Sequence, residues 1–204
     1  MKEFIVRARR AKTNPGLDID RLPQEGKMDA VCASISNALW ISGDVRRDSA
    51  IHVVLEGPQL GPKTVSFFGA QIRGLRHDER SIASYIKFAL QKGARLEKNK
   101  EAVVRTGITV SKKSFERLLF EKSGRQVVLV DKSGKDLRSF AFARDFVAII
   151  GSPEGLPPKT LDQLEKMKAE KISLGPRMLF AAHCPIIIHN EIDRREAARD
   201  ASRN

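Results

Sequence analysis

The stretch from Lys171 to Asp193 constrains the fold more than any other, because it joins a strand end, a turn and a long apolar run. Residues Ile172–Leu174 suit the end of a buried strand, and a Gly-Pro turn follows them. From Met178 to Ile188 every residue except His183 is apolar, which is too long a run for a half-buried strand. We therefore predict a helix there, buried on most sides and kinked by Pro185.

Two interpretations of this stretch remain open at the level of composition. In the first, it is a core helix that closes an α/β domain. In the second, the turn before the helix is a ligand loop at the carboxyl edge of a sheet, where α/β folds bind their ligands. Such a loop can offer free main-chain N–H and C=O groups, because neither flanking element has used them.

Unbroken apolar runs elsewhere indicate the fold class. Gln126–Val130 and Phe146–Ile150 are typical of strands that are covered on both faces. The other expected elements are strands at Phe4–Ala8, Ile51–Leu55 and Ile108–Val110, a β-hairpin at Thr64–Ile72, and helices at Met28–Ile41, Ser81–Leu90, Phe115–Phe120 and Thr160–Lys171. Strands and helices that alternate in this way predict one α/β domain over residues 1–204, with a mostly parallel sheet flanked by helices.

The bulk properties predict a cytoplasmic protein. No run approaches the roughly 18 apolar residues of a membrane span, and the N-terminus lacks the apolar core of a signal peptide. The chain has two cysteines, Cys32 and Cys184, and each lies in an apolar stretch. Two buried thiols are therefore expected in place of a disulfide.

The charge balance indicates a polyanionic partner. Lysine and arginine number 37 against 25 acidic residues, which gives a net charge of +12 and a pI near 10. Such a surplus raises the local concentration and the association rate of a nucleic acid. Aromatic residues are few, so stacking of bases on an aromatic platform is not the expected mode. Our candidates for an RNA-binding surface are Arg46, Arg47, Arg73, Arg76 and Arg80.

Several well-known chemistries are absent from the sequence. It contains no Walker loop, no GxGxxG fingerprint, no HExxH and no CxxC motif. His183 and His189 are six residues apart, on different faces of a helix, so no metal site is expected. Three strand-end loops remain as candidates. The first follows Leu129, the second spans Gly151–Pro157 and the third spans Ser173–Met178. If their strands are neighbours, these loops converge and can hold a small ligand mainly by main-chain hydrogen bonds.

Five short motifs give the chain a specific resemblance. They are, in order, Arg46-Arg47-Asp48, Asp78-Glu79-Arg80-Ser81, Ser173-Leu174-Gly175-Pro176, His183-Cys184 and His189-Asn190-Glu191-Ile192-Asp193. With them the chain closely resembles the archaeal tRNA (pseudouridine-54) N1-methyltransferases, which belong to the SPOUT class of RNA methyltransferases. The resemblance covers essentially the whole chain, and the last motif is the most specific of the five.

The resemblance implies S-adenosylmethionine as cofactor, the T-loop of tRNA as substrate, a homodimer, and a deep trefoil knot near the C-terminus. Carried over by position, the cofactor-binding residues are Leu129, Gly151, Leu174, Gly175, Pro176, Arg177, Met178, Leu179 and Cys184. One departure concerns the loop after Gly151. Members of the family often carry Asp-His there, whereas this chain has Ser152-Pro153, and Glu154 is the nearest polar substitute.

Methylation of a pseudouridine N1 requires that its proton leave, and the sequence does not identify the acceptor. Asp48, Asp78 and Glu154 are the candidates. The competing interpretation is structural: Asp48 pairs with a neighbouring arginine, and Asp78 caps a helix. Cys184, inside an apolar helix, is expected to be an inert wall and not a nucleophile.

Three other functions remain as alternatives. The chain can be a SPOUT methyltransferase for another pseudouridine, such as one in ribosomal RNA. It can also be a non-catalytic RNA-binding protein of the same fold, which the net charge of +12 would equally suit. An α/β protein with a different nucleotide ligand is disfavoured, because the sequence has no phosphate-binding loop.

Overall fold

The computed structural model describes residues 1–58, 60–151 and 155–202, and its centre is an eight-stranded sheet of order β10-β8-β9-β1-β4-β5-β7-β6. The parallel strands are β1 (Lys2–Ala8), β4 (Ser49–Leu55), β8 (Gln126–Asp136), β9 (Phe146–Ile150) and β10 (Glu170–Ser173). The antiparallel strands are β5 (Lys63–Phe68), β6 (Glu101–Arg105) and β7 (Ile108–Ser111). The predicted α/β class with a mostly parallel sheet is confirmed.

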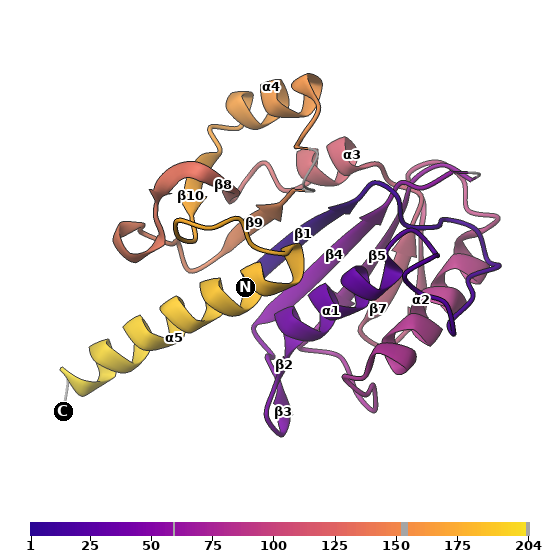
Figure 1. The fold of residues 1–204 in the computed structure, drawn as a ribbon, viewed down its shortest axis with the longest axis horizontal. Helices are drawn as coiled ribbons and strands as arrows, with labels where there is room; N and C mark the ends of the chain where they lie inside the picture. Colours follow the sequence, from indigo (N-terminus) through magenta and orange to yellow (C-terminus); the bar gives the residue numbers. More distant parts are fainter. Residues whose placement is uncertain (59, 152–154, 203–204) are drawn as a thin grey trace.

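Helices cover both faces of this sheet (Figure 1). The helices α1 (Met28–Leu39), α2 (Glu79–Gly93) and α5 (Cys184–Ala201) pack into the larger apolar cluster, which includes Phe4 and Val6 of β1. The helices α3 (Phe115–Phe120) and α4 (Pro158–Lys166) cover the second cluster, around Ile5. The neighbouring residues of β1 thus point to opposite faces, as the pleat of a strand requires.

Short polar side chains cap two helices, and the cap expected of Asp78 is one of them. The carboxylate of Asp78 accepts a hydrogen bond from the Ser81 N–H at 2.9 Å at the start of α2. The hydroxyl of Ser114 accepts one from the Arg117 N–H at 3.2 Å at the start of α3. Each cap satisfies one of the N–H groups that the first turn leaves unpaired.

The predicted β-hairpin at Thr64–Ile72 is wrong. The first half of this segment is the single strand β5, which pairs with β4 on one side and with β7 on the other. The chain leaves the sheet after Phe68, where the Gly69 N–H donates to the Ser49 carbonyl at 2.9 Å. The partner strand β7 begins only at Ile108, so local alternation could not identify it.

The first predicted helix ends two residues early. Trp40 and Ile41 form β2 (Trp40–Ile41), which pairs with β3 (Asp44–Val45) as a small antiparallel hairpin. Its two-residue turn contains Gly43, whose φ of 78° is the left-handed conformation that glycine adopts without a steric penalty. The helix therefore gives way to a hairpin that projects from the body of the domain in Figure 1.

The helix predicted at Thr160–Lys171 begins and ends earlier in the structure, and Thr160 does not cap it. The helix α4 begins at Pro158 and ends at Lys166, and Thr160 is buried in its first turn. Its hydroxyl accepts a hydrogen bond from Arg7 at 2.9 Å and donates one to Glu116 at 3.0 Å. The threonine thus joins α4 to α3 and β1 instead of satisfying its own helix end.

The helix predicted over Met178–Ile188 begins later and is less buried than expected. Met178 and Phe180 lie before it in an extended segment and are both 78% exposed. A short 3₁₀ turn, η2 (Ala181–His183), leads into α5. Pro185 occupies the first turn of α5, where its missing N–H would be unpaired in any case, so it has no hydrogen bond to break there.

Candidate cofactor loops and basic surface

The strands associated with the three predicted ligand loops are adjacent, but the loop predicted directly after Leu129 is wrong, because β8 continues as a strand to Asp136. β8 lies between β9 and β10, and all three are parallel. Leu129 of β8 is level with Ile149 of β9 and Lys171 of β10. The three strands are therefore neighbours in the sheet, as convergence of the segments that follow them requires.

The segment after β10 is open to a ligand at its main chain. Gly175 has a φ of +135°, and a Cβ added to it would meet no other atom within 4 Å. Its N–H and C=O both approach the Ser173 hydroxyl, at 3.4 and 3.2 Å. Within the described part of the chain, the main chain of residues 176–179 forms no hydrogen bond. These unpaired polar groups are what the sequence led us to expect of a cofactor loop.

Of the remaining cofactor candidates, some are buried or partly buried and others are exposed. Leu129 is buried in the apolar cluster under α3 and α4, so only its main chain can face a ligand. Gly151 is half-buried, and a Cβ added to it would lie 3.8 Å from the Leu156 side chain, an ordinary contact distance. Leu174 and Leu179 pack partly against the larger apolar cluster. Pro176, Arg177 and Met178 are exposed, so they are free to contact a bound molecule.

Cys184 is a buried thiol at the start of α5. Its side chain is only 4% exposed at the start of α5, and its sulfur lies 3.6 Å from the Phe180 carbonyl oxygen. Burial raises the pKa of this thiol to about 11. The thiol is therefore neutral near pH 7 and is not a nucleophile. Cys32 is also free and buried, so both cysteines are buried thiols.

The candidate proton acceptors that the structure describes, Asp48 and Asp78, both have structural partners. Asp48 accepts from the Lys2 ammonium at 2.8 Å and not from a neighbouring arginine. Burial acts to raise the pKa of Asp48, but the hydrogen bond and charge of Lys2 outweigh it and the pKa is lowered. Asp78 caps α2, as its structural interpretation required. Glu154 and the Ser152-Pro153 departure lie outside the described residues.

Two of the five candidate arginines are held rigidly. Arg46 forms two hydrogen bonds with the Asp193 carboxylate, at 3.0 and 2.6 Å, and so ties the hairpin segment to α5. Arg47 donates to the carbonyls of Gly69 and Ile72 at 3.1 and 2.9 Å. Its ion-pair partner is Asp44, at 3.4 Å, and not the Asp48 that the sequence suggested.

The other three arginines are on or next to the loop that follows β5. Arg73 donates to the main-chain carbonyls of that loop. Arg76 is 85% exposed and lies 3.2 Å from the Asp78 carboxylate. Arg80 is 67% exposed and pairs with Asp20. Exposed guanidinium groups paired this loosely remain available to phosphates, because surface ion pairs stabilise by only about 0–1 kcal/mol.

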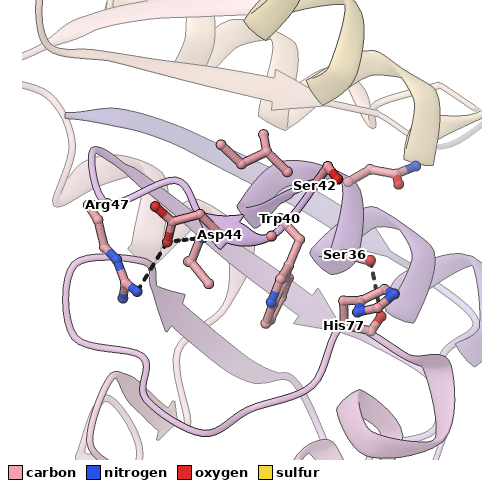
Figure 2. A pocket seen from close by; sticks show the side chains of 10 residues that line it. Ser36, Trp40, Ser42, Asp44, Arg47 and His77 are labelled. Carbon is pink, nitrogen blue, oxygen red and sulfur yellow. Dashed lines mark hydrogen bonds and ion pairs between the residues drawn. The ribbon is translucent and has the colours of Figure 1, made fainter.

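A hollow of about 620 Å³ opens beside Arg47 (Figure 2). It is lined by Ser36, Asn37, Trp40, Ile41, Ser42, Gly43, Asp44, Val45, Arg47 and His77. The sequence did not predict this site, because its walls come from the end of α1, the β2–β3 hairpin and the loop after β5. The one signal available was that Trp40 is the only tryptophan of the chain.

Residues 1–58, 60–151 and 155–202 contain no group of three His, Cys, Asp or Glu side chains that could hold a metal ion. His183 is exposed and His189 is buried, as their spacing predicted. Among the helices of the same ranges, none is long and apolar enough to cross a membrane.

Comparison with known proteins gives consistent matches over the whole chain. Residues 1–197 match the model of a family described as putative SAM-dependent RNA methyltransferases. A tRNA (pseudouridine(54)-N(1))-methyltransferase of Methanococcus maripaludis (strain C7) is 38% identical over 199 residues, which cover 95% of this chain and 99% of that protein. One of the same name from Methanocella arvoryzae is 34% identical over 196 residues, covering 96% and 100%.

The fold also matches a solved structure. Archaeoglobus fulgidus Nep1, crystallised with S-adenosylhomocysteine, superposes with a TM-score of 0.64 over 96% of this chain and 99% of that one. At 15% sequence identity this likeness shows the fold alone. The family match spans nearly all residues, and relatives well above 30% identity span both partners almost completely. The chain therefore belongs to the family of S-adenosylmethionine-dependent RNA methyltransferases.

Proposed function

We propose that this protein transfers a methyl group from S-adenosylmethionine to N1 of pseudouridine 54 in the T-loop of tRNA. The observation that carries the proposal is the identity of 38% to an enzyme of that name over almost the full length of both chains. A pseudouridine in another RNA is the alternative substrate, since the same fold would serve it. A substrate of this kind also supports a cytoplasmic location.

The residues of the loop after β10 fit the cofactor. The open space over Gly175 and the unpaired main chain of residues 176–179 suit a ligand held by main-chain hydrogen bonds. The residues that would hold it are Leu129, Gly151, Leu174, Gly175, Pro176, Arg177, Met178, Leu179 and Cys184. S-adenosylmethionine, when bound, supplies a methyl group on a sulfonium, which is an electrophile that needs no metal.

The protein's own contribution is mainly alignment. The arginines of the basic surface would bind phosphates and hold the target base, whose N1 loses its proton as the N–C bond forms. We propose Asp48, Asp78 and Glu154 as the carboxylates to test as acceptors of that proton. Asp48 has a lowered pKa and is ionised at neutral pH, so it can accept a proton, although only weakly.

The direct test is mass spectrometry of nucleosides from tRNA that carries pseudouridine 54, after incubation with the protein and S-adenosylmethionine. We expect 1-methylpseudouridine, and none from tRNA with uridine at that position. Methylation of a ribosomal RNA fragment but not of tRNA would favour the alternative substrate. No methylated nucleoside from either RNA, with cofactor binding intact, would contradict the proposed activity.

Removal of exposed arginines should weaken RNA binding in a salt-dependent way. Arg47→Ala and Arg80→Ala should each lower affinity for tRNA, because each removes a cation that neutralises a phosphate. The slope of log affinity against log salt should become shallower by about 0.7 to 0.9 for each phosphate that is no longer neutralised. Filter binding at several salt concentrations measures the slope, with affinity for S-adenosylhomocysteine as control. Unchanged slopes would mean that Asp44 and Asp20 fully occupy these side chains.

We also propose that the protein is a homodimer and that α5 helps to form its interface. Ile186 of α5 is exposed, as are Met178 and Phe180 just before it, and exposed large apolar side chains suit a protein partner. Analytical ultracentrifugation at micromolar concentration should show a dimer. Ile186→Asp should shift the protein towards monomer, whereas Phe88→Asp, on exposed α2 surface, should not. A monomeric wild-type protein would contradict the proposal.

A knotted C-terminus is the finer proposal about the fold. The main chains of Gly134 and Ile172 pass so closely that a Cβ on Gly134 would lie 2.4 Å from the Ile172 nitrogen. Arg195 of α5 donates to the carbonyls of Leu137 and Phe140 at 2.7 and 2.5 Å. The close approach of Gly134 and Ile172 belongs to the pairing of β8 with β10, whereas Arg195 holds α5 against the segment that follows β8. That contact of α5 supports a passage of the chain end through this segment.

A further inference from the structure

The hollow beside Trp40 has the size and the walls of a nucleobase site. Its volume of about 620 Å³ is in the range of pockets that hold small ligands, roughly 300 to 1,000 Å³. Figure 2 shows the indole of Trp40 between Asp44 on one side and His77 on the other. Indole presents a flat face on which a base can stack, and one such ring is enough even in a chain with few aromatics.

Polar groups around the indole can read the edge of a base. One carboxylate oxygen of Asp44 accepts from the Val45 N–H at 2.6 Å, and Arg47 lies 3.4 Å from the same atom. The second oxygen has no partner among the described residues, so it is available to an N–H group of a base. The Ser36 hydroxyl donates to the His77 carbonyl at 3.1 Å and so fixes the loop that forms the far wall.

The rim of the hollow carries the charge that a nucleotide needs. Arg47 lines it, and its guanidinium is held in place by the carbonyls of Gly69 and Ile72. Arg76 is adjacent to His77 in the chain and is almost fully exposed. A base that enters the hollow therefore has fixed and mobile cations within reach of its flanking phosphates.

The hollow is joined to the segment that follows the cofactor loop, but it is separate from the loop itself. Asn37 lines the hollow, and its amide donates to the Ala182 carbonyl at 2.8 Å. Ala182 follows the last cofactor candidate of that loop, Leu179, by three residues. None of the cofactor candidates lines the hollow, so a base bound there is not placed at the methyl group.

We propose that this hollow binds one unstacked base of the RNA substrate, a neighbour of the methylated nucleotide, with the base stacked on Trp40 and its phosphates on the arginine rim. The inference rests on the proposed RNA methylation and adds to it a second contact that reads the surroundings of the target. Single-stranded loops are where proteins read RNA bases, because their bases can be splayed out of the stack.

The only tryptophan of the chain lies at the proposed site, so its fluorescence tests the inference in the wild-type protein. We would titrate the full chain with a T-arm RNA hairpin and record Trp40 emission, then repeat with hairpins that carry an abasic site at one loop position at a time. We expect quenching that survives loss of the target base and disappears when one particular neighbour is abasic. Quenching that depends on the target base itself, or no quenching by an RNA that binds, would overturn the inference.

Variants separate this contact from the rest of the RNA surface. Trp40→Leu should weaken hairpin binding about tenfold, as expected when one base no longer stacks on an aromatic ring, whereas Trp40→Phe should retain most of the affinity. Phe88→Leu removes an exposed aromatic ring outside the hollow and should change nothing. Methyl transfer without quenching would support the proposed function and contradict the base site. Quenching without methyl transfer would support the base site and contradict the proposed function.

Discussion

Replacement of Gly175 by valine is expected to lower affinity for S-adenosylhomocysteine by about a hundredfold, or roughly 2.7 kcal/mol. In the free protein a Cβ at this position meets nothing within 4 Å, so the Cβ itself causes no clash. The same space is where a ligand would approach the main chain of the loop, and a branched side chain would occupy it. Isothermal titration calorimetry measures the loss directly.

The strain of a side chain at positive φ needs its own control. Gly175 has a φ of +135°, so valine there also costs about 1–3 kcal/mol in backbone strain. Gly61 is a matched position, because it too has a positive φ, of +68°, and open space where a Cβ would lie. Gly61→Val should lower the melting temperature without affecting the cofactor. If Gly175→Val lowers only the melting temperature, and by a similar amount, the loop has a structural role alone.

The second large effect concerns stability in mild acid, and it centres on His189 of α5. Its Nε2 lies 3.0 Å from the Ala38 carbonyl, its Nδ1 is buried without a partner in the described structure, and its ring packs edge-on against Phe4. Burial, and then the positive charge of Arg46, lower the pKa of this imidazole from 6.5 to about 4. The native protein therefore holds His189 neutral across that interval.

The sign of the pH dependence follows from that shift. Between pH 6.5 and 4 the unfolded chain takes up a proton at His189 that the folded chain excludes, so stability falls as the pH is lowered. The loss contributed by this residue by pH 4 is about 3 kcal/mol, at about 1.36 kcal/mol per unit of pKa. Well above pH 6.5 the residue contributes no pH dependence, because it is neutral in both states.

Denaturant titrations at several pH values would measure this loss. His189→Gln keeps an N–H donor for Ala38 but cannot take up a proton, so the slope of stability against pH between about 6 and 5 should fall by the equivalent of about one proton. His52, whose pKa is also lowered by burial, contributes in the same window and leaves a residual slope. Parallel curves for wild type and His189→Gln would contradict the expectation.

What the sequence determined well are the elements whose signal is local. The apolar runs at Gln126–Val130 and Phe146–Ile150 became parallel central strands, because residues covered on both faces must be apolar along their whole length. The caps Asp78 and Ser114 were predictable for the same reason, since a cap acts over only three residues.

The errors arose where a local pattern has more than one tertiary solution. An apolar run at Met178–Ile188 fits a buried helix, but the structure divides it into an exposed extended segment and a helix that starts at Cys184. An apolar sequence indicates that its side chains can be buried, but it does not show that they are buried within the same chain. The alternation of Thr64–Ile72 similarly predicted strand character but not the partners of the strand.

The same distinction between local and long-range contacts applies to the candidate site. The motif-rich loop around Gly175 could be named from the sequence, because its glycine, its turn and its place after a strand are all consecutive. The hollow around Trp40 could not, because Asn37, Asp44 and His77 meet only after α1, the hairpin and the loop after β5 have packed. The sequence alone therefore determined the apolar parallel strands, two helix caps and the candidate cofactor loop, whereas the tertiary structure decided the strand partners, the exposure of Met178 and Phe180, and the base-sized hollow. The physical reason is that the first set depends on interactions between near neighbours in the chain, and the second on contacts between segments far apart in it.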